Sequence, residues 1–308
     1  RDVAPSRGLG DVYKRQFLAF AEPYSYLIHY NGNTFDLPFL RKKADKYGIS
    51  YTLSSKKGLD IFRRITPYKN FLKLPDCKLK TIESFLGIHR EDIYTGGQLI
   101  QVYHDYTSSH DYDLYHTLIL HNADDMKGML ETLPILSYYD LFNCSIKASK
   151  AQTNYYNDMH GVPRKELIIR LIFVSPLPVA ISFMGKGCHF KAEGYEGTLV
   201  IPIYEEELKY YYANYKDYYY LPLEDTALHK SIASFVDKDY REQATARNCY
   251  TRKISLYLPQ WKVMVEPFFK RDYDSKDLFF ELTDDIKKDR QLFSDYASHV
   301  LNAIAFQD

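Results

Sequence analysis

The sequence has few cysteines, no net charge and no long apolar run. Its 308 residues contain four cysteines, Cys77, Cys144, Cys188 and Cys249, and none of them forms a Cys-x-x-Cys pair. That spacing argues against a zinc ribbon or a disulfide framework and fits a reducing compartment, so we expect a cytoplasmic protein. No apolar run approaches the roughly 20 residues that cross a bilayer, and we expect no membrane contact.

The balance of charge excludes a global basic field. The chain has 40 Lys and Arg residues against 40 Asp and Glu residues, so any binding of nucleic acid must come from a local patch. Such a patch is present, because residues 37–82 hold 12 basic residues and 3 acidic ones, whereas residues 83–142 hold 2 and 10. This division predicts a basic rim beside an acidic pocket, although two ordinary solvated helical faces would give the same counts.

The first sixteen residues, RDVAPSRGLGDVYKRQ, show no apolar period and no signal-peptide core. This string resembles translated sequencing-adapter read-through, as seen at the ends of environmental gene fragments. We therefore treat residues 1–16 as a non-native segment and expect the natural sequence to begin near Phe17.

Apolar periodicity and turn residues divide the rest of the chain into two domains. We predict an α/β domain over residues 17–142, a polar linker over 143–164, and a smaller α+β domain with an antiparallel meander over 165–308. In the first domain the patterns predict a strand at 25–30, a short helix or strand at 60–65, and helices at 37–47, 79–86 and 113–139, the last kinked or divided at Pro134. In the last domain they predict strands at 166–174, 179–184, 188–192 and 198–204, and helices at 226–236, 241–248 and 284–304.

Two segments contain residues suited to catalysis. Asp36 follows the predicted strand and opens a helix, where backbone N–H groups favour negative charge, although it could simply cap that helix. His121 and Asp125 are four residues apart on a predicted helix and can face one pocket. The neighbouring carboxylates of Asp124 and Asp125 repel each other and would attract a cation, although a solvated acidic turn is an alternative.

Taken together, Asn31-x-x-x-Phe35-Asp36 after a strand and a helical His121-x-x-x-Asp125 resemble the second and third motifs of the DEDD 3′–5′ exonucleases. The similarity is closest to the YprB-type ribonuclease H-like domain and covers roughly residues 17–142. It extends to Leu59-Asp60-Ile61, to residues 74–83, and to Leu86-Gly87-Ile88.

The resemblance implies a nuclease that hydrolyses phosphodiester bonds of DNA or RNA with two Mg²⁺ or Mn²⁺ ions held by four acids, and with no organic cofactor. Asp36 and Asp125 take the positions of two metal ligands, with Asp124 as the runner-up to Asp125. His121 takes the position of a catalytic residue that orients or deprotonates the attacking water. Asn31, Phe35 and Lys80 are the expected contacts to nucleic acid.

One part of the pattern is missing. The other two acids of this family come from an Asp-x-Glu motif on the first strand, and the 308 residues contain no Asp-x-Glu. We therefore expect a truncated, inactive fragment of a nuclease whose motif lies upstream of Phe17. The alternative is a degenerate, non-catalytic module that binds nucleic acid. A third possibility is a purely structural role for the C-terminal domain, whose Tyr210, Tyr211 and Tyr212 could stack bases or simply pack.

Overall fold

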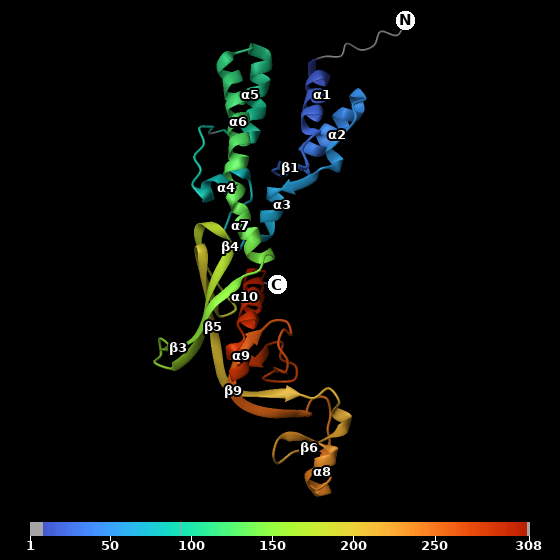
Figure 1. Ribbon diagram of the computed structural model, residues 1–308, viewed down its shortest axis with the longest axis vertical. Coiled ribbons are helices and arrows are strands. Elements are labelled where there is room, and N and C mark those ends of the chain that lie inside the picture. Colours follow the sequence, from blue (N-terminus) through green and yellow to red (C-terminus); the bar gives the residue numbers. More distant parts are fainter. Residues whose placement is uncertain (1–8, 93, 307–308) are drawn as a thin grey trace. The chain divides into compact units, whose positions relative to one another are not determined.

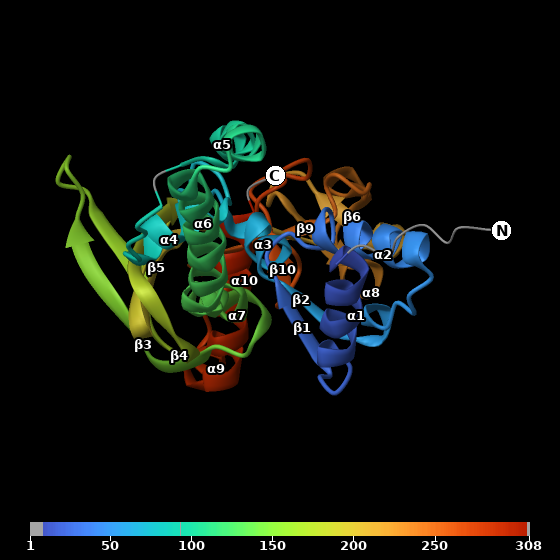
Figure 2. The same cartoon turned by 90° about the horizontal axis from the view of Figure 1, so that it is seen from above.

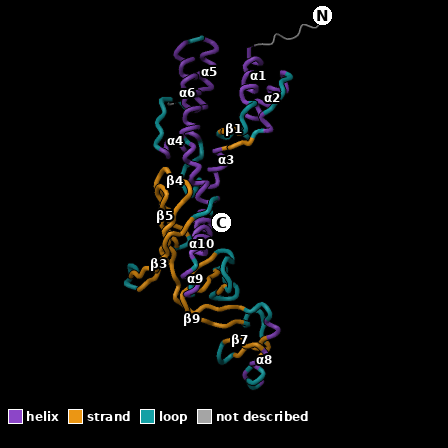
Figure 3. Tube along the Cα trace, in the orientation of Figure 1, coloured by secondary structure: helices purple, strands orange, loops and turns teal. Residues whose placement is uncertain are grey.

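The computed structural model describes residues 9–92 and 94–306, which form two compact units (Figure 1). The first unit runs to Asp140 and includes Leu177–Val179, and the second comprises Leu141–Pro176 and Ala180–Asp308. Helices dominate the first unit and strands the second (Figure 3). No helix in the described ranges is long and apolar enough to span a membrane.

The first unit contains a two-stranded sheet and several helices. β1 and β2 pair in parallel, with Ile28 opposite Leu59, and the connection between them contains the helix α2. In chain order the elements are α1 (Leu9–Ala21), β1 (Tyr26–His29), α2 (Asp36–Tyr47), η1 (Leu53–Ser55), β2 (Lys57–Asp60), α3 (Ile61–Ile65), η2 (Thr66–Tyr68), α4 (Leu79–Leu86), α5 (Gly96–Ser109), α6 (Tyr112–Glu131), η3 (Leu133–Ile135) and α7 (Leu136–Asn143), which passes the boundary between the units.

The helix α1 lies beside the strand β1 (Figure 2), and apolar side chains of α1, α2 and β1 form a common core. Leu18 and Ala21 of α1 and Ala44 of α2 are buried, and Leu27 of β1 packs against them. Among the described side chains of α1, burial begins at Leu18, although the helix itself starts at Leu9, within residues 1–16. The foreign origin of that segment stays a prediction.

Glycine ends two helices of this unit, and proline divides a long helical stretch, where the sequence predicts. Gly48 and Gly87 follow α2 and α4 with positive φ angles of 61° and 75°, the left-handed conformation in which glycine is least strained. The long helical stretch divides at Pro134, which lies in η3 between α6 and α7. The helix α5 was missed, although Thr95 and Gln98 form a complete capping box at its start.

The second unit contains a six-stranded sheet in the order β10-β11-β9-β5-β4-β3 and a three-stranded sheet in the order β7-β6-β8. Its elements are β3 (Lys147–Asn157), β4 (Pro163–Gly185), β5 (Cys188–Tyr211), η4 (Tyr215–Asp217), β6 (Tyr218–Leu221), β7 (Thr226–His229), α8 (Lys230–Ala233), η5 (Lys238–Tyr240), β8 (Glu242–Gln243), β9 (Tyr250–Gln260), β10 (Phe268–Phe269), β11 (Leu278–Glu281), α9 (Asp284–Lys288) and α10 (Arg290–Ala305). The registers recorded for β3 on β4, for β5 on β9 and for β9 on β11 are antiparallel.

Several sequence predictions for this unit are wrong. The segment predicted as a linker contains β3, whose polar residues pair along β4 from Lys147 to Asn157. The four predicted strands are parts of two long ones, because their glycine and proline residues do not interrupt β4 and β5. Residues 241–248 contain the strand β8 rather than a helix, and the predicted helix at 226–236 begins as β7.

The helix α10 supplies much of the core of the second unit. Phe293, Tyr296 and Val300 are buried on one side of it. The ring of Tyr296 meets that of Phe280 edge to face at 5.1 Å, and its hydroxyl donates to the carbonyl of Pro259 at 2.8 Å. These contacts join α10 to β9 and β11 and hold the sheet in place behind the pocket described below.

Candidate active site

The helix α6 places His121 and Asp125 on one face, as their spacing predicts. His121 Nε2 lies 3.4 Å from Asp125 Oδ2, and both side chains are partly exposed. Asp111 caps the start of α6, because its Oδ1 accepts the backbone N–H of Asp113 at 2.7 Å and that of Leu114 at 3.3 Å. The two candidate residues therefore stand on a capped helix and can act on the same small molecule or ion.

A buried carboxylate fixes the other side of the imidazole. Asp92 Oδ2 lies 2.7 Å from His121 Nδ1 and also accepts a hydrogen bond from Lys80 Nζ at 2.9 Å. The Asp92 side chain is only 1% exposed. Burial raises the pKa of Asp92, but the hydrogen bonds from His121, Lys80 and the backbone N–H of Tyr94 outweigh it and bring the pKa to about 2. Asp92 is therefore an anion at neutral pH and can hold the ring of His121 in one orientation.

Arg90 neutralises the remaining acids of this cluster. Its guanidinium donates to both carboxylate oxygens of Glu83, at 3.0 and 3.2 Å, and to Asp125 Oδ1 at 2.6 Å. Glu83 is buried against Gly128 of α6, where a Cβ atom would lie 1.8 Å from Glu83 Oε1. Burial raises the pKa of Glu83, and the charge of Arg90 partly offsets that rise. The arginine thus links α4 to the face of α6 that carries Asp125.

The two neighbouring acids of α6 have different surroundings. Asp124 Oδ2 accepts the backbone N–H of Asp92 at 2.9 Å, which fixes the loop that carries Asp92. Asp125 instead faces His121 and Arg90 and remains 45% exposed at its side chain. The carboxylate of Asp125 therefore faces the imidazole of His121, whereas that of Asp124 is bonded to the loop of Asp92.

The segment with Asp36 forms a separate group. Asp36 is exposed at the start of α2, and its side chain forms no hydrogen bond or ion pair with another residue in the described ranges. The turn before it is held by Asp60, whose Oδ1 accepts the backbone N–H of Asn31 at 2.9 Å. Asn31 has a positive φ of 55°, and the carboxylate of Asp60 thereby fixes an unusual backbone conformation at the end of β1.

Two buried polar atoms near this turn lack a hydrogen-bond partner among the described residues. His29 Nδ1 accepts the backbone N–H of Gly32 at 3.1 Å, which places the proton of a neutral ring on Nε2. That Nε2 and Asp60 Oδ2 are the two unsatisfied atoms. Neither His29 nor Asp60 has a functional role in the sequence prediction, and Asp60 helps to order the turn that leads to Asp36.

Tyr30 follows β1 and is bonded to the segment that precedes α4. Its hydroxyl donates to the carbonyl of Cys77 at 2.5 Å. Burial raises the pKa of Tyr30, and the nearby Cys77, Asp76, Glu83 and Asp60 raise it further, so both Glu83 and Asp60 are within electrostatic range of this ring. No interaction between Asp36 and Asp125 is recorded in the described ranges, and their convergence stays a prediction.

The other predicted contacts to nucleic acid have distinct positions. Phe35 is 71% exposed and stacks on Phe39 at 6.5 Å, with Lys43 lying 5.2 Å from the Phe39 ring. Lys80 uses its ammonium within the cluster, where it donates to Asp92 and to the carbonyl of Tyr94. Phe35 is therefore free to stack on a base, whereas Lys80 holds the loop of Asp92.

Sequence reasoning missed Glu83, Arg90 and Asp92. All three precede α5, in a region where only α4 has a clear periodic pattern. A weak signal was present, because Asp92 is one of the acids in the acidic block at 83–142. No local sequence pattern shows that the loop with Arg90 and Asp92 contacts α6.

Residues 4–134 match the family model of the RNase H superfamily, which supports an RNase H-like domain there and a nuclease-like function. The match begins inside residues 1–16 and ends near the close of the first unit. Comparisons with curated proteins and with solved structures give no match.

Proposed function

We propose that this chain is part of a metal-dependent nuclease, most specifically a 3′–5′ exonuclease of the DEDD type. The observation that carries the proposal is the position of His121 between Asp92 and Asp125. A base that is oriented by a second carboxylate and borders an exposed acid is the arrangement that water activation requires. The match to the RNase H superfamily supports the same conclusion at the level of a nuclease.

The roles of the residues follow from their contacts. With Asp92 accepting the proton on Nδ1, Nε2 of His121 is the nitrogen left to accept a proton from water. That water would attack the phosphorus atom of the terminal nucleotide, and its proton would pass to Nε2. The P–O3′ bond would break, so that the 3′ oxygen of the shortened strand departs and takes up a proton from solvent. Asp92 is a positioning residue in this scheme, since it acts through the ring of His121.

The described residues do not complete a metal site. They contain no group of three or more His, Cys, Asp and Glu side chains placed to hold an ion. Asp36 and Asp125 would supply two ligands for Mg²⁺ or Mn²⁺, whose preference is for carboxylate oxygen, and Asp124 is the alternative to Asp125. The acids of an Asp-x-Glu motif would supply the rest. We therefore assign no catalytic step to the metal in this chain.

Contacts to the substrate fit the exposed side of the Asp36 segment. The stacked pair of Phe35 and Phe39 offers an aromatic surface for a base, with Lys43 beside it for a phosphate. The hydrogen bond from the backbone N–H of Asn31 to Asp60 holds the turn that precedes this surface. The role of Lys80 toward nucleic acid stays a prediction. The free state of all four cysteines is compatible with a cytoplasmic location, which we also propose.

A second candidate function is a nucleic-acid-binding module without catalysis. One observation favours it, namely the guanidinium of Arg90 at 2.6 Å from Asp125 Oδ1. A permanent cation at this oxygen balances the charge that a metal would otherwise neutralise. The two candidate functions differ in one respect. In a nuclease, Asp125 can exchange Arg90 for a metal ion when the remaining metal ligands are present, and in a binding module it cannot.

Hydrolysis of labelled single strands tests the proposal. The 308-residue chain is expected to be nearly inactive with Mg²⁺ or Mn²⁺, because it contains no Asp-x-Glu. The same chain extended by an apolar strand that bears Asp-x-Glu, hereafter the extended chain, is expected to shorten a 5′-labelled strand stepwise from its 3′ end. Robust metal-dependent activity of the 308-residue chain would show that the ligand set is wrong. Binding without hydrolysis by the extended chain would favour the module.

A further inference from the structure

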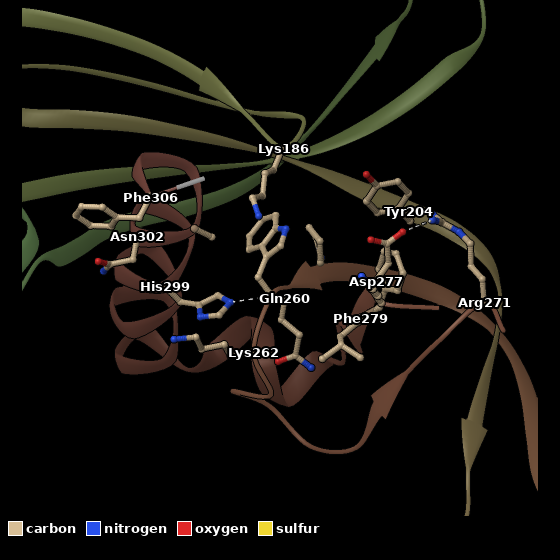
Figure 4. Close-up of a pocket in the computed structure, with 15 residues that line it drawn as sticks. Lys186, Tyr204, Gln260, Lys262, Arg271, Asp277, Phe279, His299, Asn302 and Phe306 are labelled. Carbon is tan, nitrogen blue, oxygen red and sulfur yellow. Dashed lines mark hydrogen bonds and ion pairs between the residues drawn. The ribbon is translucent and has the colours of Figure 1, made fainter. Parts of the chain in front are cut away.

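The second unit contains a basic pocket with aromatic walls that the proposed function does not use (Figure 4). Its volume is about 950 Å³, within the range of ligand-binding pockets. Four cations border it, Lys186, Lys262, Arg271 and Lys276, against the single acid Asp277. The pocket therefore suits an anion.

Three of these cations are not neutralised. Arg271 is paired with Glu206 through two hydrogen bonds of 3.1 and 2.7 Å and lies 3.5 Å from Asp277. By contrast, Lys186, Lys262 and Lys276 are exposed and have no ion pair with a carboxylate in the described part of the chain. Three exposed ammonium groups around one concavity can each meet a phosphate.

The aromatic wall is provided by Trp261, the only tryptophan of the chain. Its indole stacks on the imidazole of His299 at 5.8 Å with 27° between the ring planes, and Lys186 Nζ lies 5.9 Å from the indole centroid. Burial and the nearby Lys262 lower the pKa of His299, so this ring is neutral at neutral pH. The ring of His299 backs the indole, and only the flexible lysine side chain would have to move for a flat ligand to stack there.

The loop that carries Trp261 and Lys262 is held rigidly. The buried Gln260 accepts the backbone N–H groups of Met264 and Val265 at 2.9 and 3.0 Å and donates to the carbonyl of Val265 at 3.1 Å. His299 Nε2 also accepts the backbone N–H of Trp261 at 3.1 Å. Because the loop is already ordered, a ligand would lose little affinity to ordering it.

The first pocket adjoins a second pocket of the same unit, and the two together are called the groove below. A second pocket of about 650 Å³ shares Tyr204 and Arg271 with the first. It is bordered by Tyr155, Tyr156 and Lys165. Two acids border it as well, because Glu205 pairs with Lys165 at 2.6 Å and Glu206 pairs with Arg271. The second pocket therefore offers aromatic surface to a further base of an extended ligand, while the unpaired cations that can meet phosphates lie at the first pocket.

We propose that this groove binds single-stranded nucleic acid, with one base on the indole face of Trp261 that Lys186 now covers and with phosphates at Lys186, Lys262 and Lys276. This inference rests on the proposed function in one respect, namely that the ligand is taken to be nucleic acid rather than another anion with flat rings. The displaced ammonium of Lys186 would remain near the strand as a phosphate contact.

The fluorescence of Trp261 provides a direct test. Because the chain has a single tryptophan, excitation at wavelengths that tyrosine does not absorb reports on this site alone. The 308-residue chain is titrated with an oligothymidylate of about ten nucleotides, a length within the usual site size. A chelator is present throughout, so that hydrolysis plays no part. We expect saturable quenching and an affinity that falls with salt at a log–log slope of about −2, from roughly −0.7 for each of three phosphates.

Variants assign the binding to this pocket. Each of Lys186→Gln, Lys262→Gln and Lys276→Gln is expected to weaken binding and to lower the slope by about 0.7. Lys238→Gln, at an exposed lysine of the same unit outside both pockets, should change neither. With a labelled strand, Trp261→Ala should weaken binding about 5- to 150-fold and Trp261→Phe much less, because phenylalanine keeps a stacking face. Thermal melting confirms that each variant is folded.

The other probes give results that would overturn the inference. Inorganic polyphosphate that binds as well as the strand, with no effect of Trp261→Ala, would reduce the groove to a basic patch. Thymidine monophosphate that binds as tightly as the strand would make it a free-nucleotide site, and equal binding of duplex DNA would exclude base stacking. Absence of quenching by the strand would also refute it. None of these results depends on nuclease activity, so failure here and failure of the proposed function are separate outcomes.

Discussion

Replacing Asp125 by Asn is expected to reduce hydrolysis by the extended chain to background. The substitution keeps the size of the side chain and an acceptor for Arg90, which lies 2.6 Å from Asp125 Oδ1. It removes the negative charge that a hard divalent cation requires. The measurement is the release of nucleotides from a labelled single strand, with thermal melting to show that the fold is retained.

Asp124→Asn is the matched control for this substitution. Asp124 accepts the backbone N–H of Asp92 at 2.9 Å, and an amide oxygen can accept the same hydrogen bond. We therefore expect Asp124→Asn to retain most of the activity. Loss of activity in Asp124→Asn together with activity in Asp125→Asn would identify Asp124 as the metal ligand instead.

His121→Ala is expected to slow turnover of the extended chain by about 10²–10⁴-fold while metal binding remains. The reason is that Nε2 is the nitrogen left to accept a proton once Nδ1 is bonded to Asp92. His121→Tyr should retain more activity than His121→Ala, because a phenol at this position can still orient water. Turnover at saturating substrate, measured beside metal affinity, checks both expectations.

A packing role for His121 predicts a different pattern. The side chain is 19% exposed and contacts Asp92 and Asp125, so its removal could simply loosen the cluster. In that case His121→Ala would lower the melting temperature and leave turnover per folded molecule almost unchanged. Melting temperature and turnover measured on the wild type and the two variants therefore separate catalysis from packing.

Local patterns predict much of the first unit, because its helix ends depend on near neighbours. Gly48 and Gly87 end α2 and α4 through their backbone conformation, and Pro134 divides the long helical stretch through its missing N–H group. The shared face of His121 and Asp125 follows from helical periodicity alone, and the distance of 3.4 Å confirms it.

Features that depend on distant partners were not predictable in this way. The strand β3 is mostly exposed and polar, and it is a strand only because β4 pairs with it from Lys147 to Asn157. Similarly, Arg90 and Asp92 precede α5 in a loop without periodicity, and they reach α6 through contacts 29 to 35 residues away in sequence. A single sequence contains no local signal for such pairing.

Metal binding by the extended chain tests most directly the claim that Asp36 and Asp125 share one site. Mn²⁺ affinity is measured for Asp36→Asn, for Asp125→Asn and for the double variant. If both acids hold the same ion, each single variant should weaken binding strongly, and the double variant should lose much less than the sum of the two losses. Wild-type affinity in Asp36→Asn, or losses that add in the double variant, would contradict the claim.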